Sequence, residues 1–231
     1  IATALGTLIG AALVSMLTFV PLFVQGVNGG TAADAGAAIA PMAIGWPLSS
    51  ALAGRLVGRV GYRPLIRTGL AVTTLAALGL ALFLEPGASR LVPRIASGLF
   101  GVGLGFANTV TLIAVQGSVD FRERGVVTAS TMLFRTIGGA LAVGLLGEVL
   151  AGALRRDPSL AADAARLLAG SGGGDGLVQS QRDHLSNVLA ASLSPVFWVI
   201  FALSLGAFAI GMYFPRLRLG AERDCHLRAP E

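Results

Sequence analysis

One charged residue stands deep within an apolar stretch of this 231-residue chain. Arg135 lies eleven residues beyond Arg124, which places it about 16 Å further along a helix that rises 1.5 Å per residue. A charge at that depth in a bilayer is costly unless it faces water, a carboxylate or backbone carbonyls. Glu148, the next carboxylate on the segment, is more than three turns away. The partner of Arg135 is therefore another part of the protein, a substrate or a set of helix-end carbonyls, and we favour a structural or gating role over direct substrate contact.

Uncharged side chains within the apolar stretches supply the candidates for a substrate path. Asn108 and Thr111 lie in the middle of one stretch, Trp46 lies halfway along another, and Gln25 lies near the end of the first. At membrane depth such side chains form hydrogen bonds or packing contacts between helices more commonly than contacts with a ligand. Asn108 follows a run of closely spaced glycines, so it is our first candidate for a cavity wall, and Thr111, Gln25 and Trp46 are the others.

The motifs of hydrolytic, ATP-driven and metal-dependent chemistry are absent from the sequence. The chain has no Lys and hence no phosphate-binding loop of the kind that ends in Lys. It contains no His-Glu-x-x-His segment, and His184 and His226 both lie outside the apolar stretches. A single cysteine, Cys225, excludes an internal disulfide and a cysteine-based metal cluster. We therefore predict that the protein is not an enzyme and has neither a metal site nor a cofactor.

The composition is that of a membrane protein. Hydrophobic residues make up 54% of the chain and charged residues 13%, with a mean hydropathy of +0.76, whereas an ordinary soluble domain has about 25% charged residues. The apolar blocks are long enough to cross about 30 Å of hydrocarbon as helices of roughly 20 residues. They are far longer than the alternating segments of about 10 residues that form membrane barrels. The sequence predicts an all-α membrane protein with six transmembrane helices, at residues 3–24, 36–56, 66–84, 92–116, 125–151 and 192–214.

The arginines between these blocks predict the orientation of the chain. One membrane surface has eight of them, Arg55, Arg59, Arg63, Arg67, Arg122, Arg124, Arg216 and Arg218. The other has four, Arg90, Arg94, Arg155 and Arg156. Because cytoplasmic loops are enriched in Lys and Arg, the richer surface and both ends of the chain should be cytoplasmic. Membrane topology also explains the net charge of +5 better than nucleic-acid binding does. Residues 152–191 then form an outer loop, and residues 215–231 form a cytoplasmic tail.

Two prolines, Pro41 and Pro47, fall inside the second apolar block. Proline removes a backbone hydrogen bond and kinks a helix. Such breaks persist in membranes where a neighbouring helix or a cavity satisfies the freed carbonyls. The pair is interpreted equally well as a structural kink and as a gating hinge.

The loop that follows the second block resembles a family motif. Residues 54–64 are similar to the loop between the second and third helices of a half in the major facilitator superfamily. The family pattern is Gly, three residues, Asp, Arg, one residue, Gly and then basic residues. Gly54, Arg59, Gly61 and Arg63 match this pattern, whereas Gly58 occupies the Asp position. The copy of the motif in the C-terminal half of the family is often degenerate, which fits the loss of Asp.

Two further stretches resemble the C-terminal half of the fourteen-span drug:proton antiporters of that superfamily. The first comprises residues 21–25, 35–36 and Pro41, near the start of that half. The second comprises residues 124–125 and 134–140, in the penultimate span. With the six expected spans, the resemblance covers nearly the whole chain.

The resemblance implies a fold and a set of partners. One half of the superfamily fold consists of two inverted three-helix repeats, here residues 1–84 and 85–214. Spans one and four would line a central cavity, spans two and five would face the other half, and spans three and six would face lipid. The implied partners are a missing N-terminal half of six to eight helices, the bilayer of the plasma membrane (a bacterial inner membrane) and a small-molecule substrate, with no nucleic acid.

The implied function is secondary active transport, in which hydrophobic or cationic drug-like compounds leave the cell by alternating access in exchange for protons. A membrane-embedded carboxylate would couple the proton. Asp34 and Glu148 both lie near the outer surface, so we expect the coupling carboxylate on the missing half. The gating or structural candidates are Gly54, Arg59, Gly61, Arg63, Pro41, Pro47 and Arg135. The alternatives are a non-transporting membrane scaffold or receptor-like subunit and, more weakly, a membrane-embedded enzyme.

Overall fold

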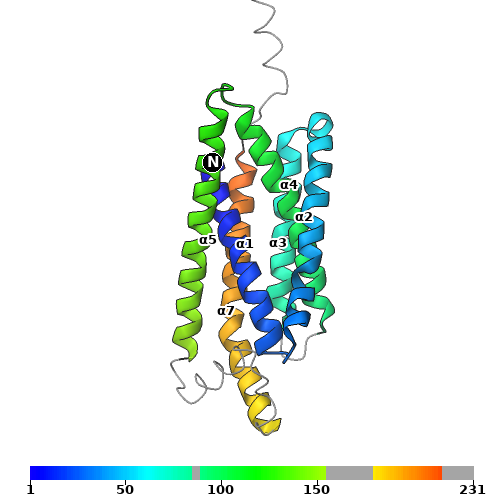
Figure 1. Ribbon diagram of the computed structural model, residues 1–231, viewed down its shortest axis with the longest axis vertical. Helices are drawn as coiled ribbons and strands as arrows, with labels where there is room; N and C mark the ends of the chain where they lie inside the picture. Colours follow the sequence, from blue (N-terminus) through cyan, green and yellow to red (C-terminus); the bar gives the residue numbers. More distant parts are fainter. Residues whose placement is uncertain (85–88, 155–178, 215–231) are drawn as a thin grey trace, which may run out of the picture.

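The computed structural model describes residues 1–84, 89–154 and 179–214, and these residues form a bundle of long helices without strands (Figure 1). The expected loop 152–191 lies partly outside the described residues, and the expected tail 215–231 lies wholly outside them. The helices are α1 (Ala2–Gly26), α2 (Ala32–Val60), α3 (Tyr62–Phe83), α4 (Leu91–Gln116), α5 (Arg124–Leu154) and α7 (Gln179–Met212).

Local sequence signals set several helix ends. Thr31 and Asp34 form a capping box at the start of α2, in which each side chain accepts a hydrogen bond from the other residue's backbone N–H. Gly61 alone separates α2 from α3, and its φ of +87° is a conformation that glycine adopts without a steric penalty. The Arg-containing loop predicted between the second and third spans is therefore a single-residue turn flanked by helical arginines.

All six helices are long and apolar enough to cross a membrane, which confirms the predicted all-α architecture for the described residues. The last helix differs from the prediction, because α7 begins at Gln179 rather than at residue 192. Most of its first ten residues are polar, so hydropathy marks only the part from Leu189 onward as a candidate span. Residues 179–191 of the expected outer loop are therefore an extension of this helix.

The core of the bundle lies among α1, α3, α4 and α7. Phe23 of α1 meets Phe197 of α7 edge-to-face, with ring centroids 5.8 Å apart, and Phe100 of α4 is fully buried. The main packing partners are α2 with α4, α3 with α4, α1 with α5, α3 with α7 and α1 with α7. In Figure 1 this leaves α5 and α2 at opposite sides of the bundle.

Glycine allows α2 and α4 to approach closely. A Cβ atom at Gly101 of α4 would lie 2.7 Å from the backbone oxygen of Met42 in α2 and 2.8 Å from its Cα. Contacts this short involve backbone atoms, which cannot rotate away. Gly101 therefore permits the close backbone approach that small residues allow between helices in membrane bundles.

We predict that Gly101→Ala destabilises the bundle, whereas Gly36→Ala does not. The first substitution overpacks the α2–α4 contact and should cost about 1–3 kcal/mol. The second adds a methyl group to α2 where no atom lies within 4 Å, and it should be neutral or stabilising by up to about 1 kcal/mol. Thermal unfolding of both variants of the full protein in detergent measures the difference. Equal melting temperatures of the two variants would contradict this prediction, because they would show that α2 and α4 can move apart at Gly101 at little cost in free energy.

Candidate functional site

Arg135 of α5 meets Asn108 of α4 near the middle of the bundle. The guanidinium Nη1 lies 3.5 Å from the side-chain oxygen of Asn108, and both residues are partly buried. The sequence predicted each residue as a candidate separately, and the structure places them together. The contact is at the long end of the hydrogen-bond range, so Arg135 retains donors for other groups.

A second polar contact joins the same two helices further along. Gln116 of α4 donates a hydrogen bond of 2.9 Å from Nε2 to the hydroxyl oxygen of Thr128 in α5. The Thr128 hydroxyl in turn donates to the backbone oxygen of Arg124, at 2.7 Å. Since α4 and α5 otherwise touch little, polar side chains provide much of the contact between them.

The backbone of α5 is held against α1 at the level of Arg135. Gly10 of α1 lies directly against the backbone oxygen of Arg135, where a Cβ atom would clash. One turn further along α5, Gly138 lies in the same way against the backbone of Thr7. These two glycines fix the position from which the Arg135 side chain extends toward α4.

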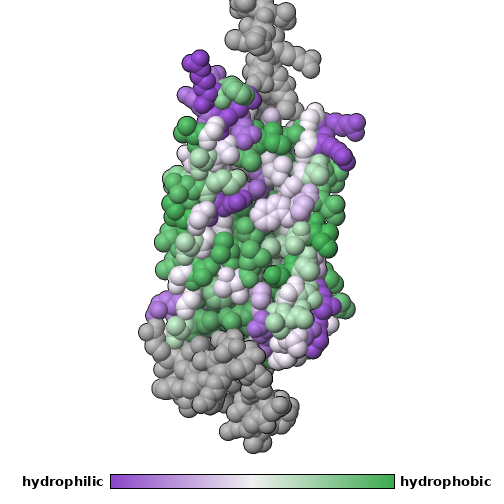
Figure 2. All heavy atoms as spheres, in the orientation of Figure 1, coloured by the Kyte–Doolittle hydropathy of each residue, from purple (hydrophilic) through white to green (hydrophobic). Residues whose placement is uncertain are grey.

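Arg135 is not neutralised by a carboxylate in the part of the chain that the structure describes. The one salt bridge between described residues is at the end of the bundle where α2 and α4 begin, and there Arg90 lies 2.9 Å from Asp34. Figure 2 shows hydrophilic atoms at mid-height on an otherwise largely hydrophobic face of the molecule, the level at which a bilayer is most apolar. A cation in that position is costly unless water, an anion or backbone carbonyls lie beside it.

The other substrate-path candidates lie apart from this contact. Thr111 is only 3% exposed, and its hydroxyl has no hydrogen-bond partner among the described residues. Trp46 is partly buried against the core of the bundle. Gln25 is partly buried in the last turn of α1. No hydrogen bond between described side chains connects these three residues with Arg135.

The gating candidates are distributed along α2 and its turn. Pro41 and Pro47 both lie inside the continuous helix α2, Pro41 beside Gly98 of α4 and Pro47 exposed. Gly54 and Arg59 are exposed, and Gly61 forms the turn. Arg63 reaches the other end of the described chain and donates a hydrogen bond of 3.3 Å to the backbone oxygen of Met212.

Sequence reasoning missed two polar contacts between distant residues. Asp34 and Arg90 are 56 positions apart and tie the start of α2 to the start of α4. Arg67, considered above only for its charge, donates a hydrogen bond of 2.5 Å to the same Met212 oxygen as Arg63. The spacing of Arg63 and Arg67 was a usable signal, because residues four apart lie on one helix face.

Comparisons with known proteins agree with this architecture. The family model described as Major Facilitator Superfamily matches residues 1–143. The Multidrug transporter protein MdtP of Bacillus subtilis is 37% identical over 134 residues, which are 58% of this chain and 25% of that protein. The Dehydrocurvularin exporter of Aspergillus terreus is 27% identical over 211 residues, which are 87% of this chain and 36% of that protein.

A third relative, the Uncharacterized MFS-type transporter MT1926 of Mycobacterium tuberculosis, is 30% identical over 153 residues, 66% of this chain. The chain thus spans between 22% and 36% of the length of these three relatives. Six apolar helices and a family match over more than half of the chain lead to one conclusion: this multi-pass membrane protein belongs to the major facilitator superfamily, a family of transporters rather than enzymes.

Proposed function

We propose that this chain is the C-terminal half of a proton-coupled transporter that exports hydrophobic or cationic drug-like compounds by alternating access. The observation that carries the proposal is the Arg135–Asn108 contact, a polar pair at mid-depth with no carboxylate beside it among the described residues. Burying such a pair against lipid costs free energy. A water-filled path between two halves of the protein avoids that cost. Two of the relatives are named as a multidrug transporter and an exporter.

Exposed apolar side chains on α2 and α5 support a companion half on this face. In α2, Ile44 is 64% exposed and Leu48 is 66% exposed. In α5, Leu141 is 60% exposed and Leu145 is 69% exposed. Lipid alone would also accept these side chains, but α5 is the helix that presents Arg135. A companion half that packs on α2 and α5 around a water-filled centre would cover the apolar side chains and leave the cation hydrated.

The pairing of the helices supports the division into two three-helix repeats, residues 1–84 and 85–214. In this division α1, α2 and α3 correspond in order to α4, α5 and α7. The counterpart of the α1–α5 contact is then the α4–α2 contact, and both contacts are extensive. The same correspondence turns α3–α4 into α7–α1, which are also packed together. Internal repeats related in this way are characteristic of transporter folds that work by alternating access.

The placement of acidic residues supports a coupling carboxylate on the other half. Among the described residues, Asp34 lies in the first turn of α2, and Asp120 and Glu123 lie between α4 and α5. Glu148 lies in the last two turns of α5, and Asp183 lies near the start of α7. None of these is at the level of Arg135, whereas a proton-coupling group acts from within the membrane.

We expect Arg135→Ala to lower the rate of dye efflux by the full-length protein about tenfold or more. Hydrogen bonds to charged groups contribute about 1.5–3 kcal/mol, and each 1.4 kcal/mol corresponds to a factor of ten. Arg135→Lys should retain part of the rate because it keeps the charge. Arg122→Gln, which removes an exposed arginine between α4 and α5, is the matched control. Wild-type efflux by Arg135→Ala at normal expression would refute the proposed role.

The arginine-rich end of the bundle should face the cytoplasm of a cell whose plasma membrane holds the protein. In a Cys225→Ser background, we expect a membrane-impermeant maleimide to label Ser89→Cys in intact cells and Gly58→Cys only after the cells are opened. Both positions are exposed and lie at opposite ends of the bundle. Labelling of Gly58→Cys in intact cells would show the reverse orientation.

A further inference from the structure

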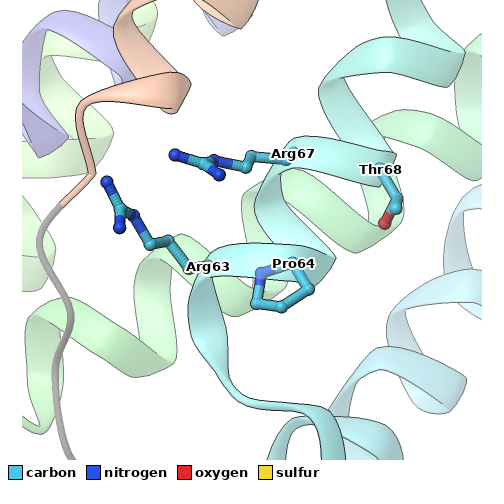
Figure 3. Close-up of a pocket in the computed structure, with 4 residues that line it drawn as sticks. All are labelled: Arg63, Pro64, Arg67 and Thr68. Carbon is cyan, nitrogen blue, oxygen red and sulfur yellow. The ribbon is translucent and has the colours of Figure 1, made fainter.

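Arg135 differs from the arginines near the helix ends in what surrounds it. Arg63 and Arg67 extend from the first turns of α3 toward the end of α7 (Figure 3), where both donate to the backbone oxygen of Met212. Arg135 lies at mid-depth, and its one hydrogen bond among the described residues is the long contact of 3.5 Å with the side-chain oxygen of Asn108. A guanidinium carries five N–H donors. Most of the hydrogen-bonding capacity of Arg135 is therefore open to another group.

The helices packed against α5 place no negative charge beside Arg135. These helices are α1, α4 and α7. The α1 helix and the part of α7 from Leu189 to Met212 have no charged side chain, and the one charged side chain of α4, Arg94, lies in its first turn. On α5 itself, Glu148 is thirteen residues further on, which is about 20 Å along a helix. Within the described residues, no carboxylate balances the charge of Arg135.

Asn108 adds a second kind of donor at the same place. Its side-chain oxygen faces Arg135, and its amide nitrogen makes no hydrogen bond among the described residues. That nitrogen carries two N–H donors. A group that only accepts hydrogen bonds, such as a carboxylate, can therefore bind both the guanidinium and the amide, and a guanidinium binds a carboxylate in a bidentate manner.

An aromatic residue of α2 lies at nearly the same depth. A Cβ atom at Gly105 of α4 would lie 2.6 Å from the backbone oxygen of Trp46, and the Ser50 hydroxyl lies 3.5 Å from the backbone oxygen of Gly105. Gly105 is three residues before Asn108, and residues so spaced are neighbours on one helix face. Among the described residues, α2 and α5 do not touch each other. The face between them thus has partly buried Trp46 on one side and Arg135 on the other.

We propose that Arg135 and Asn108 bind the acid group of the exported substrate, and that the preferred substrates are amphiphilic acids with a planar apolar body. Trp46 supplies an aromatic surface on which such a body can pack. The inference rests on the proposed function and names a substrate class for the same site. It assigns to Arg135 the substrate contact that the sequence alone ranked below gating. A cationic substrate would instead require the carboxylate expected on the other half.

A carboxylate of the companion half would also balance the charge of Arg135. We favour the substrate, because Asn108 presents amide donors beside the guanidinium and because the face between α2 and α5 is open in the described chain. A permanent ion pair with the other half would give the acid group of a substrate no advantage. The two arrangements therefore differ in whether the protein prefers an acid to its uncharged analogue.

Equilibrium binding of two probes to the full-length protein in nanodiscs tests the proposal. Pyrenebutyrate is ionised at neutral pH, whereas pyrenebutanol has the same apolar body without the charge, and empty nanodiscs correct for partition into lipid. The wild type should bind pyrenebutyrate about tenfold or more tightly than pyrenebutanol, because of the charge-assisted hydrogen bonds. Arg135→Ala should abolish this preference. Asn108→Ala should reduce it to a smaller extent, and Arg135→Lys, which keeps the charge without the planar fork, should retain part of it.

The ratio of the two affinities separates loss of the site from a general loss of folded protein, which would weaken both probes alike. Arg122→Gln is the matched control, because it removes an exposed arginine between α4 and α5, and it should keep the wild-type ratio. Equal affinity of the wild type for both probes, or an unchanged ratio in Arg135→Ala, would overturn the inference. Dye efflux by the wild type with no preference for the acid would refute this inference alone. Absence of any efflux would refute the proposed function and, with it, the assignment of an exported substrate.

Discussion

The cost of an unsatisfied polar group in hydrocarbon governs the arrangement of this bundle. Most hydroxyl side chains avoid that cost by donating a hydrogen bond to a backbone oxygen of their own helix. Thr73 donates to Gly69 and Ser204 donates to Ile200, both at 2.9 Å. The Thr74 hydroxyl lies within hydrogen-bond distance of two backbone oxygens, that of Leu70 in its own helix and that of Ser204 in α7. Arg135 cannot be satisfied in this way, since no acceptor within one turn can balance its charge. Its surroundings must therefore include water or another part of the protein.

Close helix contacts place this cation on a constrained backbone. Gly10 and Gly138 bring α1 and α5 together at the level of Arg135, and Gly101 brings α4 and α2 together. Asn108, seven residues after Gly101, consequently extends from a helix that is itself fixed. The polar pair is therefore set by packing on both sides, and its two residues remain close although the hydrogen bond between them is long.

Much of the fold could be predicted from the sequence because the bilayer imposes a length and a composition on each span. For the last span the predicted start, residue 192, is close to Leu189, where the apolar part of α7 begins, but the helix itself begins at Gln179 in a mostly polar segment that hydropathy does not mark. Contacts between distant residues had no comparable signal. Asn108 and Arg135 were identified singly from their depth, but their contact depends on how α4 and α5 lie against each other. The Asp34–Arg90 salt bridge likewise depends on the packing of α2 against α4.

The two ends of the bundle are held by different interactions. At the end where α2 and α4 begin, Asp34 pairs with Arg90 and joins these two helices. At the other end, the family's Asp position is Gly58, so the arginines beyond it lack that carboxylate. Arg63 and Arg67 bind the carbonyl end of α7 instead. A carboxylate therefore joins α2 to α4 at one end, whereas a backbone carbonyl joins α3 to α7 at the other.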